Sequence, residues 1–275
     1  MRIRVSHTTR YDYSPPAKSA IQLLRLTPRS HEGQHVRHWR MDVDAQCRLK
    51  AGEDALGNIT HAFTLEGPIQ SFSVTVDGEV ETQDSAGLVR GTVERFPPGL
   101  FLRTTTLTEP DDAILALAGE VREVMMRDPI AGLHELSGTI HARMAFDTGA
   151  TTTTTKAGAA LALGHGVCQD FAHIFVSAAR FLGVPARYVS GYLLRDDGLV
   201  AQEAGHAWAE AHVGGLGWIG FDPAHGISPT DAYVRLAAAL DYHGAAPILG
   251  SRYGGGQESL DVSVRVEHAR RQIQS

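Results

Sequence analysis

The chain is poor in cysteine and has no long apolar run, and both absences narrow what it can be. Its 275 residues include 2 cysteines, Cys47 and Cys168, too few for the disulfide framework of a small secreted domain. No apolar stretch reaches the roughly 20 residues that cross a bilayer. The N-terminus also lacks the apolar segment of a secretory signal. We therefore expect a cytoplasmic protein that does not associate with membranes.

An excess of positive charge is missing as well. The chain has 25 Lys and Arg residues against 31 Asp and Glu residues, a formal net charge of -6 at pH 7, so nucleic acid is not expected as a partner. Neither a C-x-x-C pair nor an H-E-x-x-H motif occurs, and no cofactor is expected. The 43% hydrophobic and 20% charged composition is that of an ordinary globular protein. No signal for the oligomeric state is present.

The hydrophobic pattern changes near residue 105. Before it, as in residues 3–13, apolar and polar positions alternate with the period of a strand. Pro15-Pro16 predicts the end of this first strand, and Asp77-Gly78 predicts a hairpin turn within residues 73–80. From Asp111 onward the period becomes helical. The sequence predicts an α+β protein, with a β-rich domain over residues 1–105 and a core over residues 106–275 that ends in strands.

The second cysteine stands where nucleophilic chemistry is favoured. Cys168 follows the turn 164–166 and begins a stretch whose apolar residues recur at helical spacing as far as Leu182. The free N–H groups and partial positive charge at a helix N-terminus favour a thiolate and can hold an oxyanion. The alternative is a small buried thiol without chemistry. Cys47, in a predicted strand region, is interpreted as a structural residue of that kind.

A histidine and an aspartate follow on two consecutive predicted strands. His206 opens residues 206–213, and Asp222 ends residues 218–222. The two strands run antiparallel about a glycine-rich turn, and the two side chains share a face if that turn is an odd loop or contains a bulge. A cysteine at a helix start, then a histidine and an aspartate on neighbouring strands, is the order of a nucleophile, its base and the residue that orients the base.

These segments resemble bacterial transglutaminase-like proteins. The resemblance in the core rests on residues 166–173, 183–192, 206–210 and 217–223. Residues 7–13 and 24–29 resemble the β-rich N-terminal region that is often joined to that core. The resemblance implies a papain-like, transglutaminase-like catalytic core behind a β-rich domain. It also implies the catalytic triad Cys168, His206 and Asp222.

Gln169 departs from the pattern of eukaryotic transglutaminases, which have tryptophan directly after the cysteine. Membership of the superfamily therefore does not establish protein cross-linking, and many bacterial members resemble proteases or amidases. Two interpretations of Gln169 are open, a residue that lines the oxyanion site and a solvated residue of the first helical turn. Trp208 either walls the cleft or belongs to the core.

Three classes of function follow from these residues. The first, which we expect, is an enzyme that hydrolyses amide, peptide or isopeptide bonds of a peptide or protein substrate through a thioester on Cys168. Acyl transfer from protein glutamine to an amine is its alternative, but no amine-binding motif is recognisable. The second class is a metal-binding module with ligands among Cys168, His165, His173, His206, Asp222 and His225. The third is a non-catalytic binding protein that keeps the fold.

Overall fold

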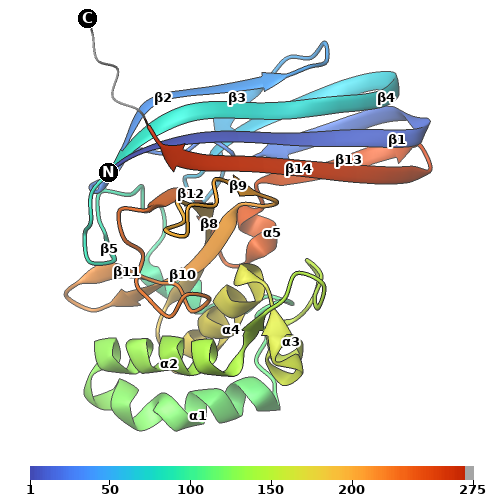
Figure 1. Cartoon of the computed structure of the whole chain (residues 1–275). Coiled ribbons are helices and arrows are strands. Elements are labelled where there is room, and N and C mark those ends of the chain that lie inside the picture. Colours follow the sequence, from blue (N-terminus) through green and yellow to red (C-terminus); the bar gives the residue numbers. More distant parts are fainter. Residues whose placement is uncertain (270–275) are drawn as a thin grey trace, which may run out of the picture.

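The computed structural model describes residues 1–269 and has two layers (Figure 1). A large antiparallel sheet lies over a smaller core, in which a five-stranded sheet separates the large sheet from the main helices. This arrangement confirms the α+β class and the β-rich N-terminal region expected from the sequence.

The first half of the chain begins with strands, and most of the helices lie between residues 98 and 181. The strands are β1 (Arg2–Leu24), β2 (Gln34–Val43), β3 (Lys50–Glu53), β4 (Ile59–Thr82), β5 (Leu88–Val89), β6 (Ala145–Phe146), β7 (His165–Gly166), β8 (Ala186–Leu193), β9 (Ala201–Gln202), β10 (His206–Val213), β11 (Gly217–Phe221), β12 (Tyr233–Ala239), β13 (Ile248–Gly254) and β14 (Gln257–His268). The helices are the 3-10 helix η1 (Pro98–Leu102), α1 (Asp112–Arg127), α2 (Pro129–Arg143), α3 (Ala157–Leu163), α4 (Cys168–Phe181) and α5 (Tyr242–Ala245). Within residues 1–269, no helix combines the length and hydropathy of a membrane span.

The large sheet is organised around β1, whose side chains alternate between its two faces. The strand order is β2-β4-β1-β14-β9, while β13 pairs with β1 and β3 pairs with β4. From Ile3 to Tyr13 every second side chain is buried, as expected for a strand with one covered face. The hydrophobic ones among them, Ile3, Val5, Tyr11 and Tyr13, share a cluster with Tyr192, Val234 and Leu236 of the smaller sheet. The inner face of β1 is therefore the contact between the two layers.

The chain returns to the large sheet at its C-terminal end. In Figure 1 the red strand β14 runs beside the blue strand β1, and the two pair from Ile3–His268 to Ser14–Gln257. Conversely, β5 pairs with β11 in the smaller sheet. The division at residue 105 that the sequence suggested therefore differs from the structure, which places residues 248–268 with the N-terminal strands. Pairing between distant strands leaves no mark in local periodicity.

The first strand also continues where prolines predict its end. β1 runs through Pro15 and Pro16, and its register against β4 shifts between Asp12 and Ala17. Such an irregularity is one of the places where a sheet accommodates proline, because a ladder hydrogen bond is already missing there. The prolines therefore mark a local change of register within one strand.

The predicted hairpin at Asp77-Gly78 is wrong, because β4 runs straight through both residues. Gly78 is opposite Trp39 in the ladder between β2 and β4. A Cβ atom on Gly78 would lie 2.1 Å from Cε3 of the Trp39 ring. The close approach of an aromatic ring from the neighbouring strand explains the glycine. In the sequence alone, the Asp77-Gly78 pair looks like a turn.

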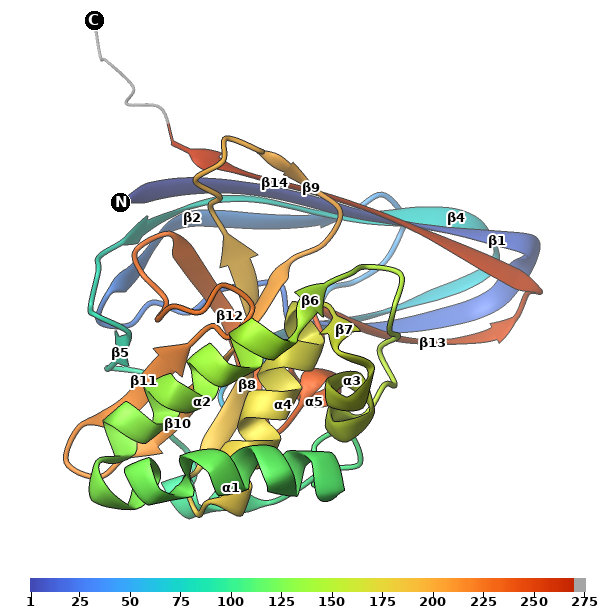
Figure 2. The same ribbon diagram turned by 60° about the horizontal axis from the view of Figure 1, so that its bottom comes forward.

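Helix α4 is the central element of the core, with α1, α2 and α3 gathered around it (Figure 2). Its buried residues include Phe175 and Ala178, which share one hydrophobic cluster with Ala209 and Ala211 of β10. Small side chains on β10 let the helix approach the sheet closely. This packing fixes the start of α4 relative to β10, and so positions Cys168 relative to His206.

A buried ionic group holds three strands of the smaller sheet together. Glu210 of β10 accepts hydrogen bonds from Arg187 of β8 at 2.6 Å and from Arg235 of β12 at 2.7 Å. Burial raises the pKa of Glu210, but the charges of Arg235 and Arg187 outweigh it and lower the pKa to about 2. Loss of either arginine would leave buried charge uncompensated, which is strongly destabilising.

Cys47 lies in the loop between β2 and β3 rather than in a strand. It is half-buried and packs against the hydrophobic cluster of the large sheet. Burial raises the pKa of its thiol. This position agrees with the structural interpretation of Cys47, although the expected strand is replaced by a loop.

The contact between Gly78 and Trp39 predicts the effect of adding one methyl group. Gly78→Ala should lower the free energy of unfolding by about 1–3 kcal/mol, because the ring or the strand must shift. Urea denaturation followed by circular dichroism measures this. The matched control is Gly52→Ala in β3, where a Cβ atom would meet only Thr60 Oγ1, at 3.5 Å. Equal effects of the two substitutions would show that the ring contact is unimportant.

Candidate active site

Cys168 is the first residue of α4, and the turn before it is held by a buried carboxylate. Asp170 accepts hydrogen bonds from the backbone N–H of Val167 at 2.9 Å and from the hydroxyl of Thr151 at 2.6 Å. A Cβ atom on Gly166 would lie 2.6 Å from Oδ2 of Asp170, so glycine is required for this approach. These contacts fix the backbone at the start of α4 and therefore the position of Cys168.

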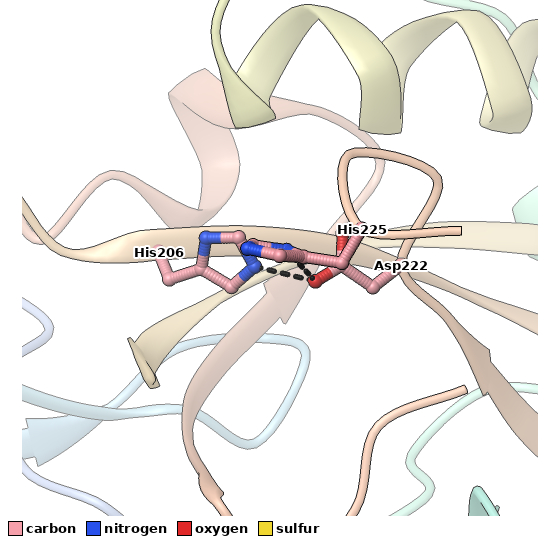
Figure 3. A group of neighbouring side chains, drawn as sticks. All are labelled: His206, Asp222 and His225. Atoms are coloured by element: carbon pink, nitrogen blue, oxygen red, sulfur yellow. Dashed lines mark hydrogen bonds and ion pairs between the residues drawn. The ribbon is translucent and has the colours of Figure 1, made fainter. Parts of the chain in front are cut away.

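Asp222 reaches His206 because the turn between their strands contains an odd number of residues. Val213 pairs with Gly217, which leaves the three residues 214–216 as the loop. His206 and Asp222 then lie on the same face of the sheet, the arrangement that the sequence left conditional on this loop. Nε2 of His206 donates a hydrogen bond to Oδ2 of Asp222 at 2.7 Å (Figure 3).

The Asp222 carboxylate is fully buried and accepts four hydrogen bonds. Besides His206, Oδ2 accepts from Nδ1 of His225 at 2.8 Å and from the hydroxyl of Tyr233 at 2.7 Å. Oδ1 accepts from the backbone N–H of Ala224 at 3.0 Å. A carboxylate with this many donors is held in one position and remains ionised although it is out of contact with water.

Two of these donors were not assigned to the site by sequence reasoning. His225 was considered only as a metal ligand, although its position three residues after Asp222 is a usable local signal. Tyr233 comes from β12, and no local pattern connects it with the aspartate. Its hydroxyl reaches Asp222 because β12 and β10 both pair with β8 in the folded sheet.

Electrostatics favours a charged pair of His206 and Asp222. Burial alone lowers the pKa of His206, but the charge and hydrogen bond of Asp222, with a hydrogen bond and charge from Cys168, raise that pKa to about 10. Burial raises the pKa of Asp222, whereas His206 and His225 outweigh it and hold the pKa well below its usual range. At neutral pH the site therefore holds an imidazolium between a carboxylate and the sulfur of Cys168.

Cys168, Gln169 and His206 line one groove of about 600 Å³. Its remaining walls come from both layers of the molecule and include Thr9 and Tyr11 of β1, and Leu260 and Val262 of β14. The candidate nucleophile and base therefore meet in a single groove, large enough for a ligand of drug or peptide size. The large sheet contributes directly to it.

The structure separates the roles open to Gln169 and Trp208. Gln169 lines the groove beside the cysteine, and its side-chain amide donates to the carbonyl oxygen of Thr153 at 3.3 Å.

Trp208 is buried and is not among the residues that line the groove. Its ring stacks near His206 and packs edge-on against Tyr233. Trp208 thus belongs to the core that supports the histidine, rather than to a wall of the cleft.

Only some of the six possible metal ligands come together in the part of the chain that the structure describes. Among residues 1–269, donor atoms of His206, Asp222 and His225 lie within 4.8 Å of one another (Figure 3). His173 is instead buried in the core, where its Nε2 accepts the backbone N–H of Tyr242 at 3.0 Å. His165 is exposed beside Asp147. The three neighbouring donors already share hydrogen bonds through one oxygen of Asp222, so the arrangement is fully accounted for by the hydrogen-bond network.

Similarity to other proteins agrees with this geometry. Residues 3–81 match the bacterial transglutaminase-like N-terminal region, and residues 116–223 match the transglutaminase-like superfamily. An uncharacterised protein of Mycobacterium leprae is 31% identical over 279 residues, which span 96% of this chain and 98% of the relative. An uncharacterised protein of Mycobacterium bovis is 29% identical, over 96% of this chain and 92% of the relative. The chain belongs to the bacterial transglutaminase-like family.

A solved structure shares the complete fold. The crystal structure of a protein from Cytophaga hutchinsonii, described as a "putative cysteine protease", superposes with a TM-score of 0.71 at 19% sequence identity. The similarity covers 100% of this chain and 92% of the other. Both layers, including the return of the C-terminal strands, are therefore part of a fold that occurs in a second, distantly related protein.

The pKa of His206 predicts how stability depends on pH. Folding raises this pKa from the ordinary 6.5 to about 10, so the stabilising contribution of the protonated ring is complete below pH 6.5 and is lost as the pH rises through about 10. The Tm of the wild type should exceed that of His206→Gln by more at about pH 6 than at about pH 10. His165→Gln, at an exposed histidine, is the control. A difference that is independent of pH would contradict the charged pair.

Proposed function

We propose that the protein hydrolyses amide, peptide or isopeptide bonds in peptide or protein substrates through a thioester on Cys168. His206 is the base and acid, and Asp222 orients it. The observation that carries the proposal is the position of the His206 ring, whose Nε2 is held by Asp222 at 2.7 Å while Cys168 contributes to its raised pKa. A cytoplasmic location, expected from the sequence, is part of this proposal.

In the first step the sulfur of Cys168 attacks the carbonyl carbon of the substrate. A C–S bond forms, and the carbonyl oxygen takes the electron pair and the negative charge. The backbone N–H of Val167 is already bonded to Asp170, and that of Asp170 to the carbonyl of Val167. The N–H groups of Cys168 and Gln169 have no partner within α4. They are the donors that the oxyanion would meet.

Collapse of the tetrahedral intermediate breaks the C–N bond. His206 donates its proton from Nδ1 to the leaving amine nitrogen, while Nε2 stays bonded to Asp222. The neutral ring then removes a proton from water, which attacks the thioester carbonyl. Departure of the Cys168 thiolate releases the free acid and returns the imidazolium, so each catalytic cycle leaves the protein unchanged.

The placement of two tryptophans favours hydrolysis over acyl transfer. A lysine-sized tunnel for an amine needs aromatic walls that exclude water. Trp208 and Trp218 are both buried and neither lines the groove. The ring of Trp218 packs instead beneath the guanidinium of Arg187, 3.9 Å from the ring centre. Neither tryptophan is available for an amine channel, although Tyr11, Phe146, Tyr188 and Tyr242 line the groove. The position of the two tryptophans supports water as the acceptor.

The first test concerns the nucleophile. Cys168→Ala and His206→Ala should each reduce kcat/KM for a cleaved peptide at least about 10³-fold, and Asp222→Ala should reduce it less. Circular dichroism checks that each variant is folded. Cys47→Ala should retain full activity. Unreduced turnover in Cys168→Ala would end the covalent mechanism.

Thiol labelling tests whether the fold is catalytically silent. Iodoacetamide at about pH 6.5 should alkylate Cys168 much faster than Cys47, because Cys168 lines the groove with His206 whereas burial raises the pKa of the Cys47 thiol. His206→Ala should slow labelling of Cys168 at least about tenfold. Mass spectrometry of tryptic peptides gives both rates from one sample. Equally slow labelling of the two cysteines would favour a non-catalytic protein.

The acceptor is tested by competition. With an acyl-donor peptide and a labelled primary amine at millimolar concentration, free acid should be the main product, because water outcompetes an amine unless a binding site raises the effective concentration of that amine. Mass spectrometry measures both products. A predominance of the labelled amide would make the protein a transferase.

A further inference from the structure

One wall of the groove is the inner face of the large sheet. Tyr11 pairs with Leu260, and Thr9 pairs with Val262, in the ladder between β1 and β14. Directly paired residues point to the same side of a sheet, and all four line the groove that contains Cys168. The N-terminal sheet is thus placed to contact any molecule bound at the cysteine.

Three large apolar side chains in this groove are left uncovered. Phe146 of β6 is 61% exposed, Leu199 in the loop before β9 is 58% exposed, and Leu260 is 55% exposed. They come from three separate segments of the chain that converge on one groove. Exposed apolar surface gathered in a concave region is typical of a binding site.

The backbone beside His206 offers partners for a peptide main chain. Glu203, Ala204 and Gly205 line the groove directly before His206. They lie outside the strands. Within residues 1–269, their backbone groups make no loop or turn hydrogen bond to another backbone group. The preceding strand, β9, lies at the edge of the large sheet. Peptide groups of this kind can pair with an added extended chain.

We propose that the groove binds an extended polypeptide that carries a large apolar side chain, of the leucine or phenylalanine class, next to the scissile amide. The side chain packs against Leu260, which shares one face of the sheet with Tyr11, while the polypeptide backbone pairs with residues 203–205. This inference rests on the proposed function and names its substrate class. It also assigns the N-terminal sheet a part in substrate selection, through β1 and β14.

The kinetic test compares two peptides that differ only in the side chain beside the cleaved amide, leucine or serine. The wild type should cleave the leucine peptide with a kcat/KM at least about tenfold higher. Leu260→Ala should reduce that preference about threefold to tenfold, mainly by raising KM for the leucine peptide. The matched control is Leu249→Ala on β13, a leucine that is 46% exposed outside the groove, which should keep the full preference. Equal preference in the two variants would overturn the proposal.

A second readout does not need turnover, and it separates this inference from the proposed function. The leucine peptide should slow alkylation of Cys168 by iodoacetamide, and the serine peptide should not. Leu260→Ala should weaken this protection, whereas Leu249→Ala should keep it. Protection without turnover would uphold the groove as a polypeptide site and remove the hydrolase. Turnover of both peptides with equal kcat/KM and equal protection would keep the hydrolase and overturn the apolar site.

Discussion

The buried carboxylate of Asp222 is the constraint on which the site depends. Without partners, burial would drive this group toward its neutral form. The hydrogen bonds from His206, His225 and Tyr233 reverse that tendency, and they require β10, β11 and β12 to be in register. The charge that Asp222 keeps is also what holds a proton on His206. Chemistry at Cys168 is therefore coupled to the correct assembly of the whole smaller sheet.

Strand β10, which begins at His206, carries another buried charged residue four positions later. Glu210 joins β8, β10 and β12 through Arg187 and Arg235, so the strand that positions the histidine is held at two points. The opposite face of β10 carries alanines that admit α4. One strand thus brings the ionic and the apolar halves of the core together, which sets the distance between the helix start and the histidine.

The N-terminal sheet has a structural role that its position in the sequence conceals. Its inner face packs on Tyr192 and Val234 of the smaller sheet, and further along the same face it becomes a wall of the groove. The strand that completes this wall, β14, comes from the other end of the chain. Residues from both regions matched by the family therefore line one groove, so the N-terminal sheet is not a separate appendage.

Sequence alone determined those features that depend on local chemistry. Glycines before an amphipathic stretch place Cys168 at a helix start, alternation places His206 and Asp222 on neighbouring strands, and small residues predict the face that α4 covers. The tertiary structure decided the rest. Gly78 resembles a turn residue until Trp39 is seen above it, and nothing local connects Tyr233 with Asp222 or β14 with β1. These features arise from contacts between residues far apart in the chain, and local pattern records only the period of each segment, not the partner against which it packs.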